Sequence, residues 1–149
     1  MSSKNFEILK NYEGWESETH TYEVEKGAVL KFIDAIGDDN PLYSNESTFR
    51  GLIAPPTFPI TFNRPGQRPT FEGVVGARLH GEQEFSYNRP LKVGETVNVK
   101  TSVTSVEEKQ GRGATLTIIR LETVGTSLNE EPIYIAKQTA MIRLIVKEQ

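Results

Sequence analysis

A short polar run between Ile36 and Tyr43 contains residue types that acid–base chemistry needs. Asp38 lies inside it, in the sequence Gly-Asp-Asp-Asn-Pro-Leu. A carboxylate can take a proton from water, and a second group must then deliver a proton to the substrate. Histidine does this well because its reference pKa is about 6.5, whereas a tyrosine at about 10 is a far poorer partner. The chemistry open to this run therefore depends on what stands beside Asp38.

His80 is the other candidate for proton transfer, as a substitute acid or as a hydrogen-bond donor to a bound substrate. A lone histidine is more often structural, and we assign no role to His20. Because the two histidines are far apart and the chain has no cysteine, we expect no metal site and no cofactor. Asp38 also has a structural interpretation, since an Asp after a helix-ending glycine commonly bonds its own backbone. Asn40 is expected to hold the loop in the same way.

The elements that position this run are predicted from apolar spacing. Val29, Phe32, Ile33 and Ile36 lie at helical spacing, which predicts an amphipathic helix over 26–36 with Gly37 at its end. Residues 19–25 favour a short strand before it.

An irregular, proline-rich segment follows from Asp38 to about Pro69. One short helix is expected there, near residues 47–49 or 58–62. Pro55, Pro56 and Thr57 either line a narrow pocket entrance or form a rigid covering loop, and Phe58 either faces a ligand or belongs to the core.

The second half of the chain alternates apolar and polar residues, as half-buried strands do. We predict four consecutive antiparallel strands, near residues 82–87, 97–103, 116–124 and 133–146. Such a sheet must cover one face, and one helix lying across it would do so. The expected fold class is α+β, an antiparallel sheet wrapped around one central helix. Pairing two sheets edge to edge would remove an open edge, so a dimer is expected.

Composition restricts the class of protein. The chain has 149 residues, a formal charge of −3 and no cysteine. Its length suits one domain, 1–149, with a substantial core. We expect no nucleic-acid partner, because nothing in the charge favours one. No apolar stretch approaches the length of a membrane span and no signal peptide is evident, so a cytoplasmic protein is expected.

Four motifs, taken together in this order, resemble the MaoC-like dehydratases and (R)-specific enoyl hydratases, which have the hot-dog fold. The resemblance covers residues from Thr21 to about Val146. The motifs span residues 36–43, 53–58, 79–85, and 89–91 followed by Gly94-Glu95. The resemblance implies addition or removal of water on acyl thioesters of coenzyme A or acyl carrier protein. In the family an Asp and a His do the chemistry. Here Asp38 is present, but Tyr43 replaces the histidine.

The family has two-domain members in which a degenerate N-terminal half holds the acyl tail and the other half holds the Asp and His. The Leu79-to-Gln83 signature and Tyr43 resemble that degenerate half. The resemblance thus implies a substrate-holding subunit paired with a catalytic hot-dog chain. A self-sufficient homodimeric hydratase using Asp38 with Tyr43 or His80 is the first alternative. A non-enzymatic, regulatory acyl-CoA-binding protein is the second.

The resemblance also implies which residues would meet the substrate. Substrate contacts are expected from Asn40, Pro55, Pro56, Thr57, Phe58 and Gly81. Arg64, Arg68, Arg78 and Arg89 are candidates for the phosphates of coenzyme A or of the carrier-protein arm, although a single surface arginine is more often only solvated.

Overall fold

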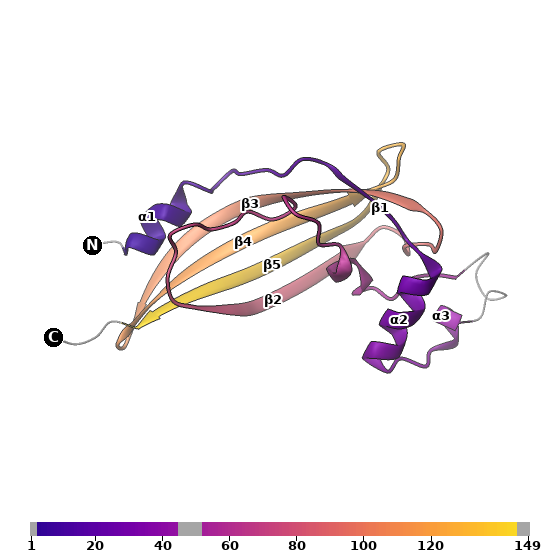
Figure 1. Cartoon of the computed structure of the whole chain (residues 1–149), viewed down its shortest axis with the longest axis horizontal. Coiled ribbons are helices and arrows are strands. Elements are labelled where there is room, and N and C mark those ends of the chain that lie inside the picture. The colour runs from indigo at the N-terminus through magenta and orange to yellow at the C-terminus, as the bar shows by residue number, and fades with distance from the viewer. Residues whose placement is uncertain (1–2, 45–51, 146–149) are drawn as a thin grey trace.

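The computed structural model describes residues 3–44 and 52–145. Within these residues five antiparallel strands form one sheet in the order β1-β3-β4-β5-β2, as Figure 1 shows. The strands are β1 (His20–Glu23), β2 (Ala77–Tyr87), β3 (Thr96–Gly111), β4 (Ala114–Thr126) and β5 (Pro132–Ile145). The helical elements are α1 (Lys4–Lys10), α2 (Lys26–Ile36), α3 (Pro41–Ser44) and the 3₁₀ helix η1 (Phe58–Thr61). The predicted layout of an early strand, a helix and four later strands is confirmed.

Helix α2 has the predicted bounds, and Gly37 ends it in the left-handed conformation with φ 67°. The amide of Asp38 then donates to the carbonyl of Ile33 at 3.2 Å, which closes the helix end. Val29 is buried, but Ile36 is 48% exposed. The prediction that Ile36 shares the buried face is wrong, because α2 lies against one end of the sheet (Figure 1) and its last turn extends beyond the core.

Helix α1 was not predicted. Seven residues with an apolar pair at Phe6 and Leu9 give a weak periodic signal, and so short a helix depends on tertiary packing. Here the hydroxyl of Ser3 accepts from the amide of Phe6, and Leu9 is fully buried against the sheet. In the described part of the chain, no helix is long and apolar enough to cross a membrane.

Two clusters of buried side chains lie along one face of the sheet. The first lies under α2 and η1, and includes Val29, Phe58, Val97 and Ile133. The second lies at the other end, under α1. It consists of Leu9, Val103, Val106, Ile119, Leu121 and Ile142. Residues 62–76, which we call the strap, run from the α2 end to the start of β2 (Figure 1). The strap contributes Phe71 and Val74 to the second cluster.

Strand β2 lies at the edge of the sheet, paired with β5 alone. It begins five residues before the predicted strand, at Ala77. Its residues from 77 to 82 are all exposed. A register shift between His80 and Glu82 makes a bulge at Gly81. A Cβ at Gly81 would lie 3.1 Å from the carbonyl oxygen of Thr139, so a larger residue there would make a tight contact with the β5 backbone.

Candidate functional site

The loop after α2 is held by its own side chains. A carboxylate oxygen of Asp38 accepts from the amide of Asn40 at 2.9 Å, and the side-chain oxygen of Asn40 accepts from the amide of Leu42 at 3.1 Å. These are the turn contacts predicted for both residues. The amide of Tyr43 donates to the carbonyl of Asn40 at 3.0 Å, which begins the single turn of α3. Of the two carboxylates in this loop, Asp39 is exposed, while Asp38 is half-buried and already accepts one hydrogen bond.

Tyr43 lines a cavity of about 320 Å³, which we call the loop cavity. The cavity joins the helix-end motif to the proline motif and to the end of β2. Its walls are formed by Tyr43, Ile53, Ala54, Pro56, Tyr87, Asn88, Arg89, Pro90 and Leu91. Three of the four sequence motifs thus meet at this cavity.

Tyr87 is a wall residue that the sequence analysis did not single out. Its hydroxyl donates to the carbonyl oxygen of Pro56 at 2.6 Å, and its ring lies 5.6 Å from that of Tyr134. Burial raises the pKa of Tyr87 well above its ordinary value. Phe85 and Tyr87 are two positions apart on β2 and so lie on the same, inner face of the sheet. This alternation is the sequence signal that could have identified Tyr87 as an inward residue.

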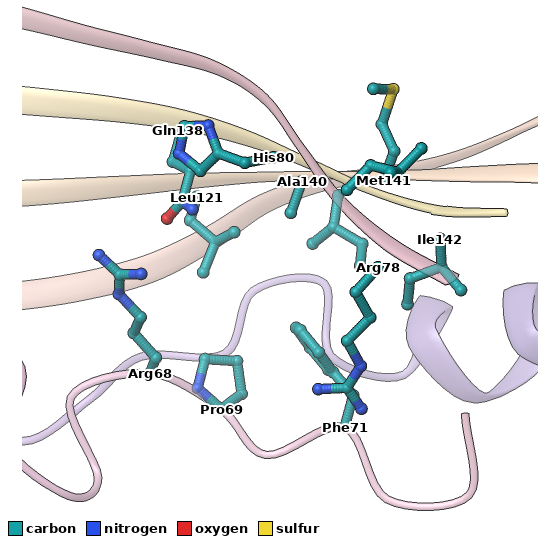
Figure 2. A pocket seen from close by; sticks show the side chains of 12 residues that line it. Arg68, Pro69, Phe71, Arg78, His80, Leu121, Gln138, Ala140, Met141 and Ile142 are labelled. Atoms are coloured by element: carbon teal, nitrogen blue, oxygen red, sulfur yellow. The ribbon is translucent and has the colours of Figure 1, made fainter. Parts of the chain in front are cut away.

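His80 lines a second cavity, of about 310 Å³, which we call the edge cavity. It opens between the first half of β2, the second half of β5 and the strap (Figure 2). Its lining combines aliphatic floor residues with basic groups: Arg68, Pro69, Phe71, Arg78, Leu79, His80, Ile119, Leu121, Gln138, Ala140, Met141 and Ile142.

The two candidate acids lie in different cavities. Tyr43 shares the loop cavity with Tyr87, while His80 stands seven positions earlier on the same strand. At about 3.3 Å per residue that separation is roughly 20 Å along β2. Within one chain, the geometry therefore does not bring His80 to the Asp38 loop.

The expected substrate contacts are divided among several environments. Pro56 lines the loop cavity, and Thr57 precedes η1 as its N-cap residue. Pro55 is buried. Phe58 is 2% exposed and packs edge-on against Phe32, with ring centroids 5.6 Å apart, so its side chain belongs to the core and lines neither cavity. These positions favour the covering-loop interpretation for Pro55 and the core interpretation for Phe58.

The four candidate arginines also differ. Arg64 donates to the carbonyl of Thr21 at 2.7 Å and lies over the ring of Tyr22. Arg89 forms a two-pronged pair with Glu95, at 2.8 and 2.9 Å, which raises the pKa of the Arg89 guanidinium. Both are therefore engaged in the fold. Arg68 and Arg78 line the edge cavity instead.

Comparison with known proteins identifies the class. Solved structures with the same fold include the HadBC (3R-hydroxyacyl-ACP dehydratase) complex of Mycobacterium tuberculosis, with a TM-score of 0.74 and 21% identity over 87% of this chain and 96% of that one. The (R)-hydratase of A. caviae matches with a TM-score of 0.61 and 17% identity, covering 86% and 94% of the two chains. The fold is the hot-dog fold, as expected from the motifs.

The family follows from the sequence match. The model of the FAS1-like, dehydratase domain region matches residues 11–136, and the chain belongs to this family. Among curated relatives, a UPF0336 protein of Thermobifida fusca is 36% identical over 100 residues, which is 60% of this chain and 66% of that protein. A UPF0336 protein of Saccharopolyspora erythraea is 28% identical over 84% of both chains. The match to the first of these spans about two thirds of its length.

Proposed function

We propose that this chain is the substrate-holding subunit of an (R)-specific hydratase or dehydratase acting on acyl thioesters. A second hot-dog chain would supply the histidine that Tyr43 replaces. The observation that supports this most directly is the separation of Asp38 from an imidazole. The helix-end loop contains the carboxylates of Asp38 and Asp39 and the phenol of Tyr43, and His80 lines the other cavity. Among the described residues, no imidazole accompanies Asp38, so this loop alone lacks an acid–base pair suited to neutral pH.

A partner chain also has a surface to cover. Strand β2 is an unpaired edge whose first half is exposed on both sides. Large apolar side chains are exposed on α2, η1 and β2, namely Leu30 at 43%, Ile36 at 48%, Ile60 at 47% and Leu79 at 45%. Native proteins seldom leave such an edge and such side chains uncovered. A second sheet that continues β2 would cover both.

The similar structures support pairing between different chains. HadBC and ChsH1-ChsH2 of Mycobacterium tuberculosis are both complexes, and the latter matches with a TM-score of 0.73 over 97% of this chain and 92% of that one. We extend their mode of assembly to this chain as part of the proposal. A 3-hydroxyacyl or trans-2-enoyl thioester, carried on coenzyme A or on an acyl carrier protein, is then the substrate.

The test is reconstitution. The purified chain is assayed for hydration of crotonyl-CoA alone, and again after mixing with a hot-dog chain that has both Asp and His in its helix-end loop. We expect hydration only in the mixture, and co-elution of the two chains in gel filtration. A non-pairing hot-dog chain of equal size serves as the control.

Two outcomes would replace this proposal by its alternatives. Full turnover by the purified chain, abolished by Asp38→Asn, would make it a self-sufficient homodimeric hydratase. Binding of acyl-CoA with no turnover in any mixture, and no co-elution, would make it a regulatory binding protein.

A further inference from the structure

The strap is held by residues near the start of the chain. The hydroxyl of Tyr22 on β1 donates to the side-chain oxygen of Gln67 and accepts from the amide of Arg64 at 3.0 Å. At the other end of the strap, the side chain of Asn5 in α1 bonds to the backbone of Val75. In the described part of the chain, no side-chain hydrogen bond joins the strap to β2 or β5. The strap is one wall of the edge cavity, so its contacts with β1 and α1 determine where that wall lies.

His20, the first residue of β1, makes a further contact with the strap whose strength depends on a proton. Its Nδ1 lies 3.1 Å from the carbonyl oxygen of Glu18, and its Nε2 lies 3.2 Å from the carbonyl oxygen of Pro65 in the strap. A carbonyl oxygen only accepts hydrogen bonds, so each ring nitrogen needs a proton to bond there. The neutral imidazole carries one N–H and the imidazolium carries two. Both contacts are therefore complete only when the ring is protonated.

The charged groups around His20 do not favour one sign. Its own segment contributes the carboxylate of Glu18, and the strap contributes the guanidinium of Arg64, which is already engaged by a backbone carbonyl at 2.7 Å and by an aromatic ring. On β3 the uncharged Val99 lies opposite His20. The neighbouring Lys100 points to the other face of the sheet and pairs with an acid at 2.9 Å. The two facing carbonyl oxygens are thus the feature that distinguishes the protonated ring from the neutral one.

The strap has a turning point on each side of the residues that line the edge cavity. Gly66 has φ 85° and Gly73 has φ 75°, both in the left-handed region that glycine adopts readily. Gly66 lies directly under His20, because a Cβ there would be 3.8 Å from the His20 Nε2. Residues 68–71, between these glycines, include three that line the cavity. A loosened contact at Pro65 can therefore move this wall without disturbing the sheet.

We propose that His20 is a protonation-dependent latch that holds the strap over the edge cavity. Histidine side chains take up a proton around pH 6.5. In more acidic solution the ring donates to both carbonyl oxygens and holds the strap at Pro65. As the pH rises, one donation is lost and the strap keeps its attachments through Tyr22 and Asn5 alone. The wall then moves away from the apolar floor of the cavity, which becomes accessible. This latch belongs to the single chain and is independent of the proposed function.

Amide hydrogen exchange of the full chain tests the latch, at about pH 5.5 and about pH 8, on either side of the histidine range. Each exchange rate is divided by that of the unfolded chain at the same pH, which leaves the protection due to structure. We expect strap amides to be about fivefold better protected at the lower pH, the factor equivalent to one net hydrogen bond. Amides of β4 should be equally protected at both, because the latch is local.

Three variants assign the effect to His20. His20→Asn, neutral at every pH, should give the weaker protection of the strap at both pH values. His20→Arg, which is always charged and has several donors, should give the stronger protection at both. His80→Asn is the matched control, since it removes the other of the two histidines and should leave the pH dependence intact. Dependence that persists in His20→Asn, or disappears in His80→Asn, would overturn the proposal. So would strap protection that is equal at both pH values in the unmodified chain, or an equal change in β4.

A single engineered thiol tests access to the cavity. Because the chain has no cysteine, Ala140→Cys places one thiol on the cavity floor. Its labelling rate is divided by that of the same variant in denaturant at the same pH. We expect this ratio to be about fivefold higher near pH 8 than near pH 5.5, and to lose that rise when His20→Arg is added. A rise of equal size with and without His20→Arg would come from the thiol itself and would overturn the control of access by His20. No rise in either variant would overturn it as well.

Discussion

The hydroxyl of Tyr87, near the end of the edge strand, donates a hydrogen bond of 2.6 Å to the carbonyl oxygen of Pro56 in the proline motif. These residues are 31 positions apart, and the bond joins two walls of the loop cavity. The position of the proline motif relative to the end of β2 thus depends partly on the Tyr87 hydroxyl.

Replacing Tyr87 by Phe should lower the free energy of unfolding by about 1 kcal/mol, the usual net value of one hydrogen bond. The cost stays modest because Pro56 is exposed, so water can reach its freed carbonyl. Urea denaturation of the purified chain measures the change. Tyr43→Phe is the matched control, since the Tyr43 hydroxyl makes no hydrogen bond among the described residues. An equal loss of unfolding free energy in Tyr87→Phe and Tyr43→Phe would contradict a stabilising hydrogen bond between Tyr87 and Pro56.

Stability should fall in alkaline solution because of two tyrosines. Burial raises the pKa of Tyr134, with smaller contributions from Tyr87 and Tyr22, and burial also raises the pKa of Tyr87. In the unfolded chain both ionise near pH 10. Their neutral forms therefore stabilise the fold fully below about pH 10, and this contribution is lost as the pH rises toward the folded-state values.

Absorbance of tyrosinate against pH is the measurement, with unfolding followed in parallel by circular dichroism. We expect two of the five tyrosines to resist ionisation until the chain unfolds. The variant Tyr134→Phe should leave only one such tyrosine. Ionisation of all five in the folded state would refute the prediction.

Tyr43→His tests whether the helix-end loop retains catalytic geometry. The substitution places an imidazole in α3, five residues after Asp38, and positioned acid–base groups contribute about 10²–10⁴-fold to rate. We expect the variant alone to hydrate crotonyl-CoA measurably, and Asp38→Asn in the same variant to remove that activity. Tyr43→Gln is the control without an acid. Inactivity of Tyr43→His in a folded chain would show that the loop has lost its catalytic geometry.

Gly125 is expected to tolerate substitution poorly. It pairs with Tyr134 across β4 and β5, and a Cβ there would overlap the buried Tyr134 ring. Gly125→Ala should destabilise the chain by about 3 kcal/mol, at the upper end for overpacking. Gly27→Ala in α2, where a Cβ meets nothing within 4 Å, should instead stabilise it by up to about 1 kcal/mol. Thermal unfolding compares the stability of the two variants. A change in stability of the same sign in Gly125→Ala and Gly27→Ala would contradict the packing described for Gly125.

The sequence predicted the strands and α2 because their apolar residues repeat over many positions. Helix α1 was not predicted because its stability comes from contacts with β3 and the strap, which are distant in sequence. The first half of β2 was not predicted either, since residues 77–82 are all exposed and show no alternation of buried and exposed positions.

The candidate site was predicted in part. The turn contacts of Asp38 and Asn40 are local and could be foreseen, whereas the cavity shared by the helix-end and proline motifs was not predicted. The placement of His80 in another cavity could not, because it depends on which end of β2 lies beside α3. Likewise, nothing local in the sequence distinguishes Arg68 and Arg78 from Arg64 and Arg89. The distinction arises from which residues lie near each guanidinium after folding.

The side chain of Asn5 binds the backbone of Val75 on both sides, donating to its carbonyl at 2.6 Å and accepting from its amide at 3.1 Å. Helix α1 is thereby fastened to the end of the strap, beside the start of β2. A fusion or affinity tag that disturbs the first turn of α1 would loosen one wall of the edge cavity.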